Sequence, residues 1–365
     1  MKKVSRRNFL KVSGAMAAAG ALAACGGSGA STPAASGAAS TSTAASAAAA
    51  GEDKFASLGD FTMTVGHAQP EGNPRFVSME QFAADVAEAT NGHVKIEVYG
   101  NGQLGTEKEM LEQVVAGTVQ GMRGGQFDFS PRLLMFTLPF LTNTRAQVTA
   151  LLQSDLAQKV CAEAEGETGT VIINLCDAGG YRQFSNSKHP IKAPADLKGL
   201  KMRTNGMKTI DMTFQAMGAT TTIPYSDLYM GLKTGVADGQ ENPWVNVEGM
   251  KFYEVQKYFT EVNYQFHPDP FYVNAAWWNG LPEEYRDIIA ECATKMGEYN
   301  DELIDKNSNA AKQTIVDYGC EVYEPSADEL KAFQTAVQSV YDQCVTEGIC
   351  TADEIKEMQD IVAKA

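Results

Sequence analysis

The chain has 365 residues and a formal net charge of −15. This length is enough for two domains of ordinary size. Removal of the first 24 residues, which carry five Lys or Arg and no acid, leaves a charge of −20. The acidic balance argues against nucleic acid as a partner, because the sequence contains no basic patch with interleaved aromatic residues.

The N-terminus has the pattern of an export signal. Residues 5–11 read S-R-R-N-F-L-K, close to the twin-arginine motif, and the apolar run that follows is too short to span a bilayer as a helix. The sequence L-A-A-C, which ends at Cys25, resembles a bacterial lipobox. We therefore expect a signal peptide over 1–24 and a lipid on Cys25. A cleaved signal with an incidental cysteine stays open, as does the choice between twin-arginine and general secretory export.

A tether follows the expected lipidation site. Residues 26–51 contain only Gly, Ser, Ala, Thr and Pro, so they cannot build a core. We expect 25–55 to hold an extracytoplasmic domain away from the membrane surface.

The first folded elements alternate between strand and helix periodicity. Apolar residues alternate over 61–67 and again over 94–98, and they recur at helical spacing over 76–86 between these two strands. A strand, a helix and a second strand in this order indicate the start of a parallel sheet. A further helix is expected around 110–115 and a buried strand over 171–175.

The stretch from 196 to 242 contains the strongest candidate binding residues. Residues 200–204 form a short strand with Arg203 near its carboxyl end, where ligands bind in open α/β sheets. Its guanidinium can hold a carboxylate through two parallel hydrogen bonds. Further on, Asp238-Gly239 is a turn signal that precedes Asn242, whose amide can both donate and accept. A surface cation at Arg203 and a plain polar loop at Asn242 are the alternatives.

The C-terminal third is expected to return to a strand and then become helical. Residues 262–266 alternate as a strand does, the prolines of 267–270 break the chain, and 271–278 form a further strand. Residues 283–318 contain no proline and a single glycine, so they form one long helix or two helices broken near Gly297. Two more helices are expected over 326–347 and 351–365.

Several motifs in this order resemble the substrate-binding proteins of tripartite ATP-independent periplasmic (TRAP) transporters, of the dicarboxylate-binding type. The resemblance runs from about Phe61 to about Asn309. The motifs are L-P-F-L at 138–141, G-Y-R-Q-F-S-N-S-K-H-P-I-K-A-P-A-D-L-K-G at 180–199, G-L-K-M-R at 199–203, G-V-A-D-G-Q-E-N-P at 235–243 and Y-E-V-Q-K-Y at 253–258.

The resemblance implies an α/β fold of the periplasmic-binding-protein type, with a cleft between two lobes and a long helix that braces both. Lobe 1 is then expected over 56–180 and about 267–300. Lobe 2 is expected over 181–266 and about 301–350, with a separate C-terminal helix at 351–365.

The same resemblance implies which residues bind. Arg203 is expected to hold a ligand carboxylate, with Asn242 beside it and Arg182 either in contact or in support. Other residues that could line the pocket are His67, Phe129, Tyr225 and Phe266. The implied function is capture of a small organic acid, for example a C4-dicarboxylate, and its delivery to the small and large integral-membrane subunits of the transporter.

Two other functional classes stay open. A binding lipoprotein of an ATP-driven importer would share the lobes and the anchor, whereas an anchored hydrolase would need a catalytic constellation that no motif here supplies. No cofactor or metal site is indicated. Of the six cysteines after Cys25, Cys344 and Cys350 flank a turn at Gly348 and are the disulfide pair we would test first.

Overall fold

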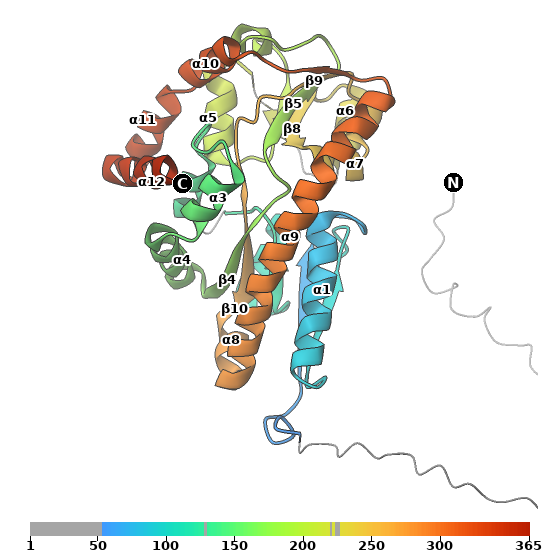
Figure 1. Cartoon of the computed structure of the whole chain (residues 1–365), viewed down its shortest axis with the longest axis vertical. Helices are drawn as coiled ribbons and strands as arrows, with labels where there is room; N and C mark the ends of the chain where they lie inside the picture. The colour runs from blue at the N-terminus through green and yellow to red at the C-terminus, as the bar shows by residue number, and fades with distance from the viewer. Residues whose placement is uncertain (1–52, 128–129, 220, 223–226) are drawn as a thin grey trace, which may run out of the picture. The chain divides into compact units, whose positions relative to one another are not determined.

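A computed structural model of the chain describes residues 53–127, 130–219, 221–222 and 227–365 (Figure 1). The first of its two sheets has the strand order β2-β1-β3-β10-β4. β1 pairs in parallel with β2 and β3, and β10 runs antiparallel to β3 and β4. The bounds are Phe61–His67 (β1), Val94–Tyr99 (β2), Gly121–Arg123 (β3), Thr170–Asp177 (β4) and Pro268–Asn274 (β10).

The second sheet has the order β11-β9-β5-β8-β6-β7. β8 lies between β6, to which it is parallel, and β5, to which it is antiparallel. The bounds are Arg182–Asn186 (β5), Met202–Thr204 (β6), Thr221–Thr222 (β7), Gly239–Pro243 (β8), Tyr258–Thr260 (β9) and Glu321–Tyr323 (β11). The chain therefore passes from the first sheet to the second after Asp177 and returns before Pro268.

Helices cover both sheets (Figure 1). Those that precede residue 250 are α1 (Pro74–Ala89), α2 (Glu107–Ala116), α3 (Arg145–Leu152), α4 (Asp155–Thr168), α5 (Lys208–Ala216), α6 (Leu228–Thr234) and α7 (Trp244–Gly249). Those in the last part are α8 (Ala275–Gly280), α9 (Glu283–Asp317), α10 (Ala327–Ala336), α11 (Ser339–Thr346) and α12 (Ala352–Lys364). Short 3-10 turns occupy Pro131–Thr137, Pro194–Leu197 and Phe252–Glu254.

The long helix α9 is continuous. Its 35 residues correspond to about 52 Å at 1.5 Å per residue. It packs on α1 and on β4, a strand of the first sheet. It also packs on α7, which follows β8 of the second sheet (Figure 1). Gly297 does not break it: a Cβ there would lie 2.8 Å from Nδ2 of Asn174, whose amide bonds the carbonyl of Ala293. The glycine therefore lets β4 approach the helix, which confirms the expected bracing element.

Three sequence-based assignments near the C-terminus are wrong. Residues 262–266 form no strand, although Val262, Tyr264 and Phe266 are buried as their alternation suggested. The strand expected over 271–278 is β10 at 268–274, and residues 275–278 lie in the helix α8. β10 includes both Pro268 and Pro270, because β3 pairs only with its later residues and leaves that part of β10 without a strand on one side. The region 326–347 holds two helices instead of one.

The polar stretch before Pro243 is also a strand and not a loop. β8 is buried along its whole length, with strands on both sides. Its polar side chains bond to one another and to the neighbouring strand: Gln240 Nε2 donates to Ser185 Oγ at 2.8 Å, and Asn242 Nδ2 donates to Gln240 Oε1 at 2.5 Å. Sequence polarity misled the assignment because these side chains satisfy each other inside the sheet.

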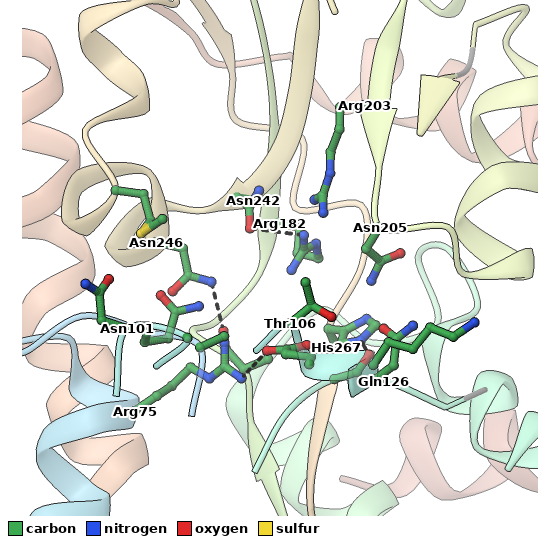
Figure 2. Close-up of a pocket in the computed structure, with 18 of the residues that line it drawn as sticks. Arg75, Asn101, Thr106, Gln126, Arg182, Arg203, Asn205, Asn242, Asn246 and His267 are labelled. Atoms are coloured by element: carbon green, nitrogen blue, oxygen red, sulfur yellow. Dashed lines mark hydrogen bonds and ion pairs between the residues drawn. The ribbon is translucent and has the colours of Figure 1, made fainter. Parts of the chain in front are cut away.

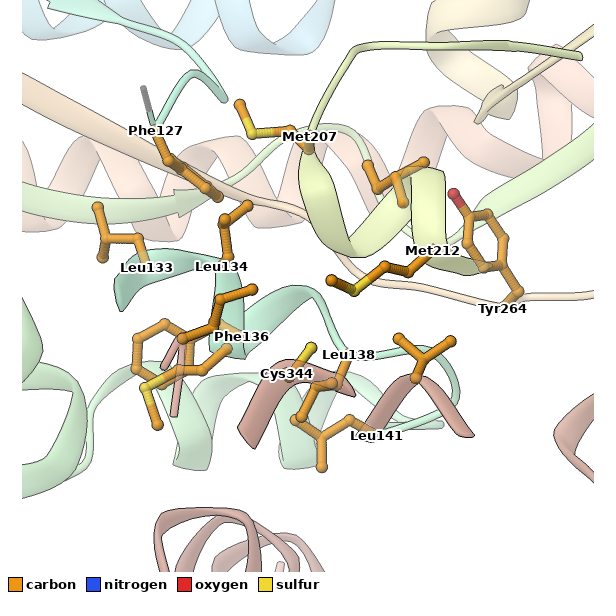
Figure 3. Close-up of a cluster of buried hydrophobic side chains, with 14 of the residues drawn as sticks. Phe127, Leu133, Leu134, Phe136, Leu138, Leu141, Met207, Met212, Tyr264 and Cys344 are labelled. Carbon is orange, nitrogen blue, oxygen red and sulfur yellow. The ribbon is translucent and has the colours of Figure 1, made fainter. Parts of the chain in front are cut away.

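The largest apolar cluster of the described residues joins several helices to the turn Pro131–Thr137 and to strands of both sheets (Figure 3). Figure 3 shows Leu134 of the turn Pro131–Thr137 below Met207, the residue directly before α5. Cys344 and Cys350 are both buried in this cluster. All six cysteines of the described residues are free, so this candidate pair forms no disulfide in the structure. None of the helices in the described ranges is long and apolar enough to cross a membrane.

The position of Gly239 between two strands generates a stability prediction. A Cβ at Gly239 would lie 2.2 Å from the backbone oxygen of Ser185 and 2.5 Å from Sδ of Met202. We expect Gly239→Ala to lower the free energy of unfolding by about 3 kcal/mol or more through overpacking. Gly166→Ala, in α4 with no atom within 4 Å of the added carbon, should instead stabilise by up to about 1 kcal/mol. Urea denaturation of both variants checks this, and equal effects would contradict it.

Candidate ligand-binding site

A cleft of about 470 Å³ lies where the strands of both sheets end. In the first sheet its lining residues follow the carboxyl ends of β1, β2 and β3, namely Gln69, Asn101 and Gln126. In the second sheet Asn205 follows β6 and Asn242 lies near the end of β8. Side chains at the carboxyl ends of several strands converge at one edge, and the volume suits a small molecule.

Arg203 reaches into this cleft from β6. It is 3% exposed, and its backbone pairs with Gln240 of β8 on one side and with Thr221 of β7 on the other. Figure 2 shows its guanidinium on the side of the cleft where Asn242 and Arg182 lie. Pairing with both neighbouring strands therefore fixes the Arg203 backbone, while the side chain lines the cleft.

Arg182 also lines the cleft, and it is held by an ion pair with the buried Glu241. Its Nε donates to Oε2 of Glu241, and its Nη2 donates at 2.8 Å both to Oε1 and to the backbone oxygen of the same residue. The hydroxyl of Tyr264 donates to Oε2 at 2.6 Å. Burial, together with the Glu241 charge, raises the pKa of Tyr264 well above its usual range. The carboxylate thus matches the charge of Arg182 and fixes its orientation.

Asn242 is positioned by the same group. Its Oδ1 accepts a hydrogen bond from Nη2 of Arg182 at 3.2 Å, while its Nδ2 donates to Gln240. The side chain is 2% exposed and lines the cleft. Because hydrogen bonds hold both Oδ1 and Nδ2, the second N–H of the Asn242 amide and the second lone pair of its oxygen point in defined directions.

The first sheet contributes a second buried charge cluster around Asp269. Arg75 donates from Nε at 2.9 Å and from Nη2 at 2.5 Å to its two oxygens. Arg123 places its Nε 2.7 Å from Oδ2, an ionic contact outside hydrogen-bond alignment. The Arg123 guanidinium also bonds Ser78 at 2.9 Å and Asn300 of α9 at 2.9 Å. Arg75 lines the cleft, and the buried Asp269 carboxylate compensates its positive charge.

Among the described residues that line the cleft, Glu107 is the one carboxylate. It is the first residue of α2, directly after Thr106, which caps the helix by accepting from the backbone N–H of Glu109. Its Oε1 lies 3.5 Å from Nη2 of Arg75. Burial raises its pKa and the Asp269 charge adds to this, whereas the charges of Arg75 and Arg203 oppose it. The 23% of its side chain that is accessible faces the confined cleft.

Two buried histidines lie at the first-sheet side. His267 lines the cleft, stacks on Phe127 with ring centroids 5.2 Å apart, and contacts the carbonyl of Gly125 through Nε2 at 3.0 Å. Burial, with the nearby Arg182 charge, lowers the pKa of His267 to about 3. His67 ends β1 below the cleft, where its Nδ1 accepts from the backbone N–H of Gln69 at 2.9 Å. Burial holds its pKa well below the usual value, so both rings are neutral.

The structure brings three of the expected site residues together: Arg203, Asn242 and Arg182 all line the cleft. His67 is fully buried and is not among the lining residues. Phe266 lines a separate cavity of about 360 Å³. Tyr225 and Phe129 lie outside the described residues.

Sequence reasoning missed the first-sheet half of the site. The missed residues that line the cleft include Gln69, Arg75, Asn101, Glu107, Gln126 and His267. Two of them could have been predicted from their position, because Gln69 and Asn101 come soon after strands that the apolar alternation did predict. Asn205, directly after the Arg203 strand, could have been found in the same way.

No group of three or more His, Cys, Asp or Glu within the described ranges is arranged to hold a metal ion. The polar groups that the described residues bring to the cleft are three arginines, a lysine, a carboxylate, amides, a threonine hydroxyl and a neutral histidine. Such a set binds an anion and hydroxyl groups through hydrogen bonds.

Comparison with known proteins identifies relatives over most of the chain. The family described as bacterial extracellular solute-binding protein, family 7, matches residues 65–347, and a twin-arginine translocation signal matches residues 3–23. A solute-binding protein of Chromohalobacter salexigens is 30% identical over 80% of this chain and 87% of its own. The 2,3-diketo-L-gulonate-binding periplasmic protein of Escherichia coli is 28% identical over 84% of this chain and 94% of its own.

A solved structure supports the fold. The galactonate complex of a sugar acid binding protein from Advenella mimigardefordensis superposes with a TM-score of 0.80 at 22% identity, covering 84% of this chain and 99% of that one. The fold of two sheets braced by a long helix is therefore the fold of that protein.

The neutral state of His267 predicts a pH dependence of stability. Its pKa is about 3 when folded and about 6.5 when unfolded, so below pH 6.5 only the unfolded state takes up the proton. Protonation of His267 in the unfolded state therefore leaves the free energy of unfolding unchanged above pH 6.5 and lowers it progressively as the pH falls below 6.5. Between pH 7 and pH 5 we expect the native chain to lose about 2 kcal/mol more than His267→Gln. Denaturation at both pH values measures this. The exposed His189→Gln should behave like the native chain, and an identical loss in all three proteins would refute the assignment.

Proposed function

Because the chain belongs to family 7 of the bacterial extracellular solute-binding proteins, the substrate-binding components of TRAP transporters, we propose that its cleft captures a small organic acid through Arg203. The observation that carries this proposal is a buried arginine at the carboxyl end of β6, in a cleft lined from both sheets. The Escherichia coli relative is a 2,3-diketo-L-gulonate-binding protein, and diketogulonate is an organic acid.

The roles of the two second-sheet arginines differ. Arg182 directs Nε and Nη2 at Glu241, so its charge is matched inside the protein and it orients Asn242. Arg203 stands across the same cleft edge and is the residue to which we assign the ligand carboxylate, in a bidentate contact. Asn242 then hydrogen-bonds the same carboxylate or a neighbouring hydroxyl.

Ligand binding is proposed to close the cleft. We assign residues 56–180 and about 267–300 to lobe 1, and residues 181–266 and about 301–350 to lobe 2, with 351–365 as a C-terminal helix. A ligand that contacts Arg203 and Asn242 in one lobe and Gln126 or Glu107 in the other stabilises the closed state, because only that state makes both sets of contacts. Closure also removes water and strengthens the charged hydrogen bonds.

The closed protein would deliver its ligand to the small and large integral-membrane subunits of the transporter. Membership of this family favours that role over the ATP-driven importer and over the anchored hydrolase, since the family consists of transport proteins and not of enzymes. The twin-arginine match over residues 3–23 supports export across the cytoplasmic membrane. The site of action is accordingly extracytoplasmic.

A lipid anchor on Cys25 is a separate proposal. The export signal match ends at residue 23, and L-A-A-C places a cysteine two residues later, followed by glycines. Lipidation there would leave the tether 26–51 between the membrane and the folded part. The residues concerned lie outside the described ranges, so the proposal rests on their sequence.

Replacement of Arg203 tests the carboxylate contact. A thermal-shift screen of residues 52–365 against monocarboxylates, dicarboxylates, sugar acids and neutral sugars should give a positive shift with an organic acid. At a hundredfold excess over Kd, binding stabilises the native state by about 2.7 kcal/mol. Arg203→Ala should fold and show no shift, whereas Arg286→Ala on α9, outside the cleft lining, should respond like the native chain. A response to neutral sugars alone, or an unaffected Arg203→Ala, would sink the proposal.

Cys25→Ser tests the anchor. The full chain, expressed with its own signal, should appear in the membrane fraction and partition into the detergent phase of Triton X-114, because an acyl chain supplies about 0.8 kcal/mol per buried methylene. The serine variant should appear in the soluble extracytoplasmic fraction. If both proteins are soluble and equal in mass apart from the substitution, Cys25 carries no lipid.

A further inference from the structure

We propose that Glu107 makes the cleft selective for hydroxylated monocarboxylates of the sugar-acid class and excludes dicarboxylates of equal length. The inference rests on the proposed function, since it takes the first carboxylate to be held by Arg203. It assigns the chemistry of the other end of the ligand.

The two ends of the cleft differ in charge. The second-sheet end holds Arg203, with Arg182 and Asn242 beside it, and Figure 2 shows these three on one side of the cleft. The opposite side in Figure 2 holds Arg75, Thr106, Gln126 and His267 from the first sheet. Glu107, bonded to Arg75, belongs to this opposite side. A ligand that spans the cleft therefore meets Arg203 at one end. At the other end it meets the Glu107 carboxylate, beside Arg75, which is paired with Asp269 and Glu107, and beside Lys108.

The position of Glu107 is fixed by its helix. It is the first residue of α2, and the reciprocal bonds of Thr106 and Glu109 determine where that helix begins. A carboxylate at a helix N-terminus is favoured by the helix dipole. Oε1 lies 3.5 Å from Nη2 of Arg75, which draws the side chain toward the cleft wall. Glu107 is therefore a structured part of the site.

The arginines near Glu107 already have carboxylate partners. Asp269 is fully buried, receives two hydrogen bonds from Arg75 and lies 2.7 Å from Nε of Arg123. A second ligand carboxylate would enter beside Glu107, where like charges in a confined space repel. A hydroxyl in the same place would instead donate to the Glu107 oxygens, because an ionised carboxylate only accepts.

The remaining groups of the cleft suit a chain of hydroxyls. Amide and hydroxyl side chains line it from both sheets, and each amide combines donors with an acceptor. These residues are Gln69, Asn101, Thr106, Gln126, Asn205 and Asn246. An ammonium group on the ligand is disfavoured at Glu107, because Arg75 lies within 3.5 Å of the same carboxylate. A ligand with one carboxylate and several hydroxyls fits this arrangement.

The test compares acids of equal length that differ at one end. Threonate is paired with tartrate and gluconate with glucarate, and calorimetric Kd values are measured at pH 8, where ionisation of Glu107 is favoured. The native protein should bind at least one monocarboxylate tenfold more tightly than its dicarboxylate partner. In Glu107→Gln this ratio should fall at least fivefold, mainly through tighter dicarboxylate binding. Glu107→Asp, which keeps the charge, should retain the preference.

Glu112→Gln is the matched control, since Glu112 is an exposed carboxylate on the same helix and lies outside the cleft lining. Its ratio should equal that of the native protein. Equal or tighter binding of the dicarboxylate by the native protein, or an unchanged ratio in Glu107→Gln, would overturn the inference and leave the proposed function standing. Preferred binding of 6-aminohexanoate would also overturn it. If no acid binds and no Arg203-dependent thermal shift exists, the proposed function fails as well.

Discussion

The site depends on the matching of buried arginines by buried carboxylates. A guanidinium taken out of water is costly unless an anion and further hydrogen bonds compensate it, and removal of one partner of such a pair typically costs about 3–5 kcal/mol. Glu241, in the middle of β8, meets this requirement for Arg182, and Asp269, in β10, meets it for Arg75 and Arg123. Both carboxylates are fully buried and lie in strands that have one end at the cleft. The charge pairs therefore stabilise the sheet edges that position the ligand-binding groups.

The same matching extends to the crossing between the two sheets. Asp177, the last residue of β4, accepts from the backbone N–H groups of Gly179 at 2.8 Å and Gly180 at 2.6 Å, and from Arg145 at 2.5 Å. Both glycines have positive φ, at 124° and 93°, so they permit a turn that other residues would resist. The backbone oxygen of Asp177 accepts from Arg123, which joins the crossing to the Asp269 cluster. Rigid charge clusters on either side of two glycines are a suitable basis for lobe closure.

The sequence predicted the elements with regular periodicity and the groups that carry a permanent charge. β1, the strand containing Arg203 and the long helix came from alternation and from the absence of proline, and Arg203, Asn242 and Arg182 do share one cleft. β8 was missed because its polar residues are satisfied by partners in β5 and in β8 itself, which no local pattern reveals. Glu107 was missed for a similar reason: it is one acid among many until the fold places it beside Arg75.

The central claim is that Arg203 and the ligand carboxylate contact each other directly. A double-mutant cycle between protein and ligand tests this most directly, with the acid that binds best and its primary amide measured against the native chain and Arg203→Ala. Direct contact predicts that removal of the ligand charge weakens binding to the native chain by a factor of ten or more and leaves binding to Arg203→Ala almost unchanged. Equal weakening in both proteins would show that the carboxylate is held elsewhere.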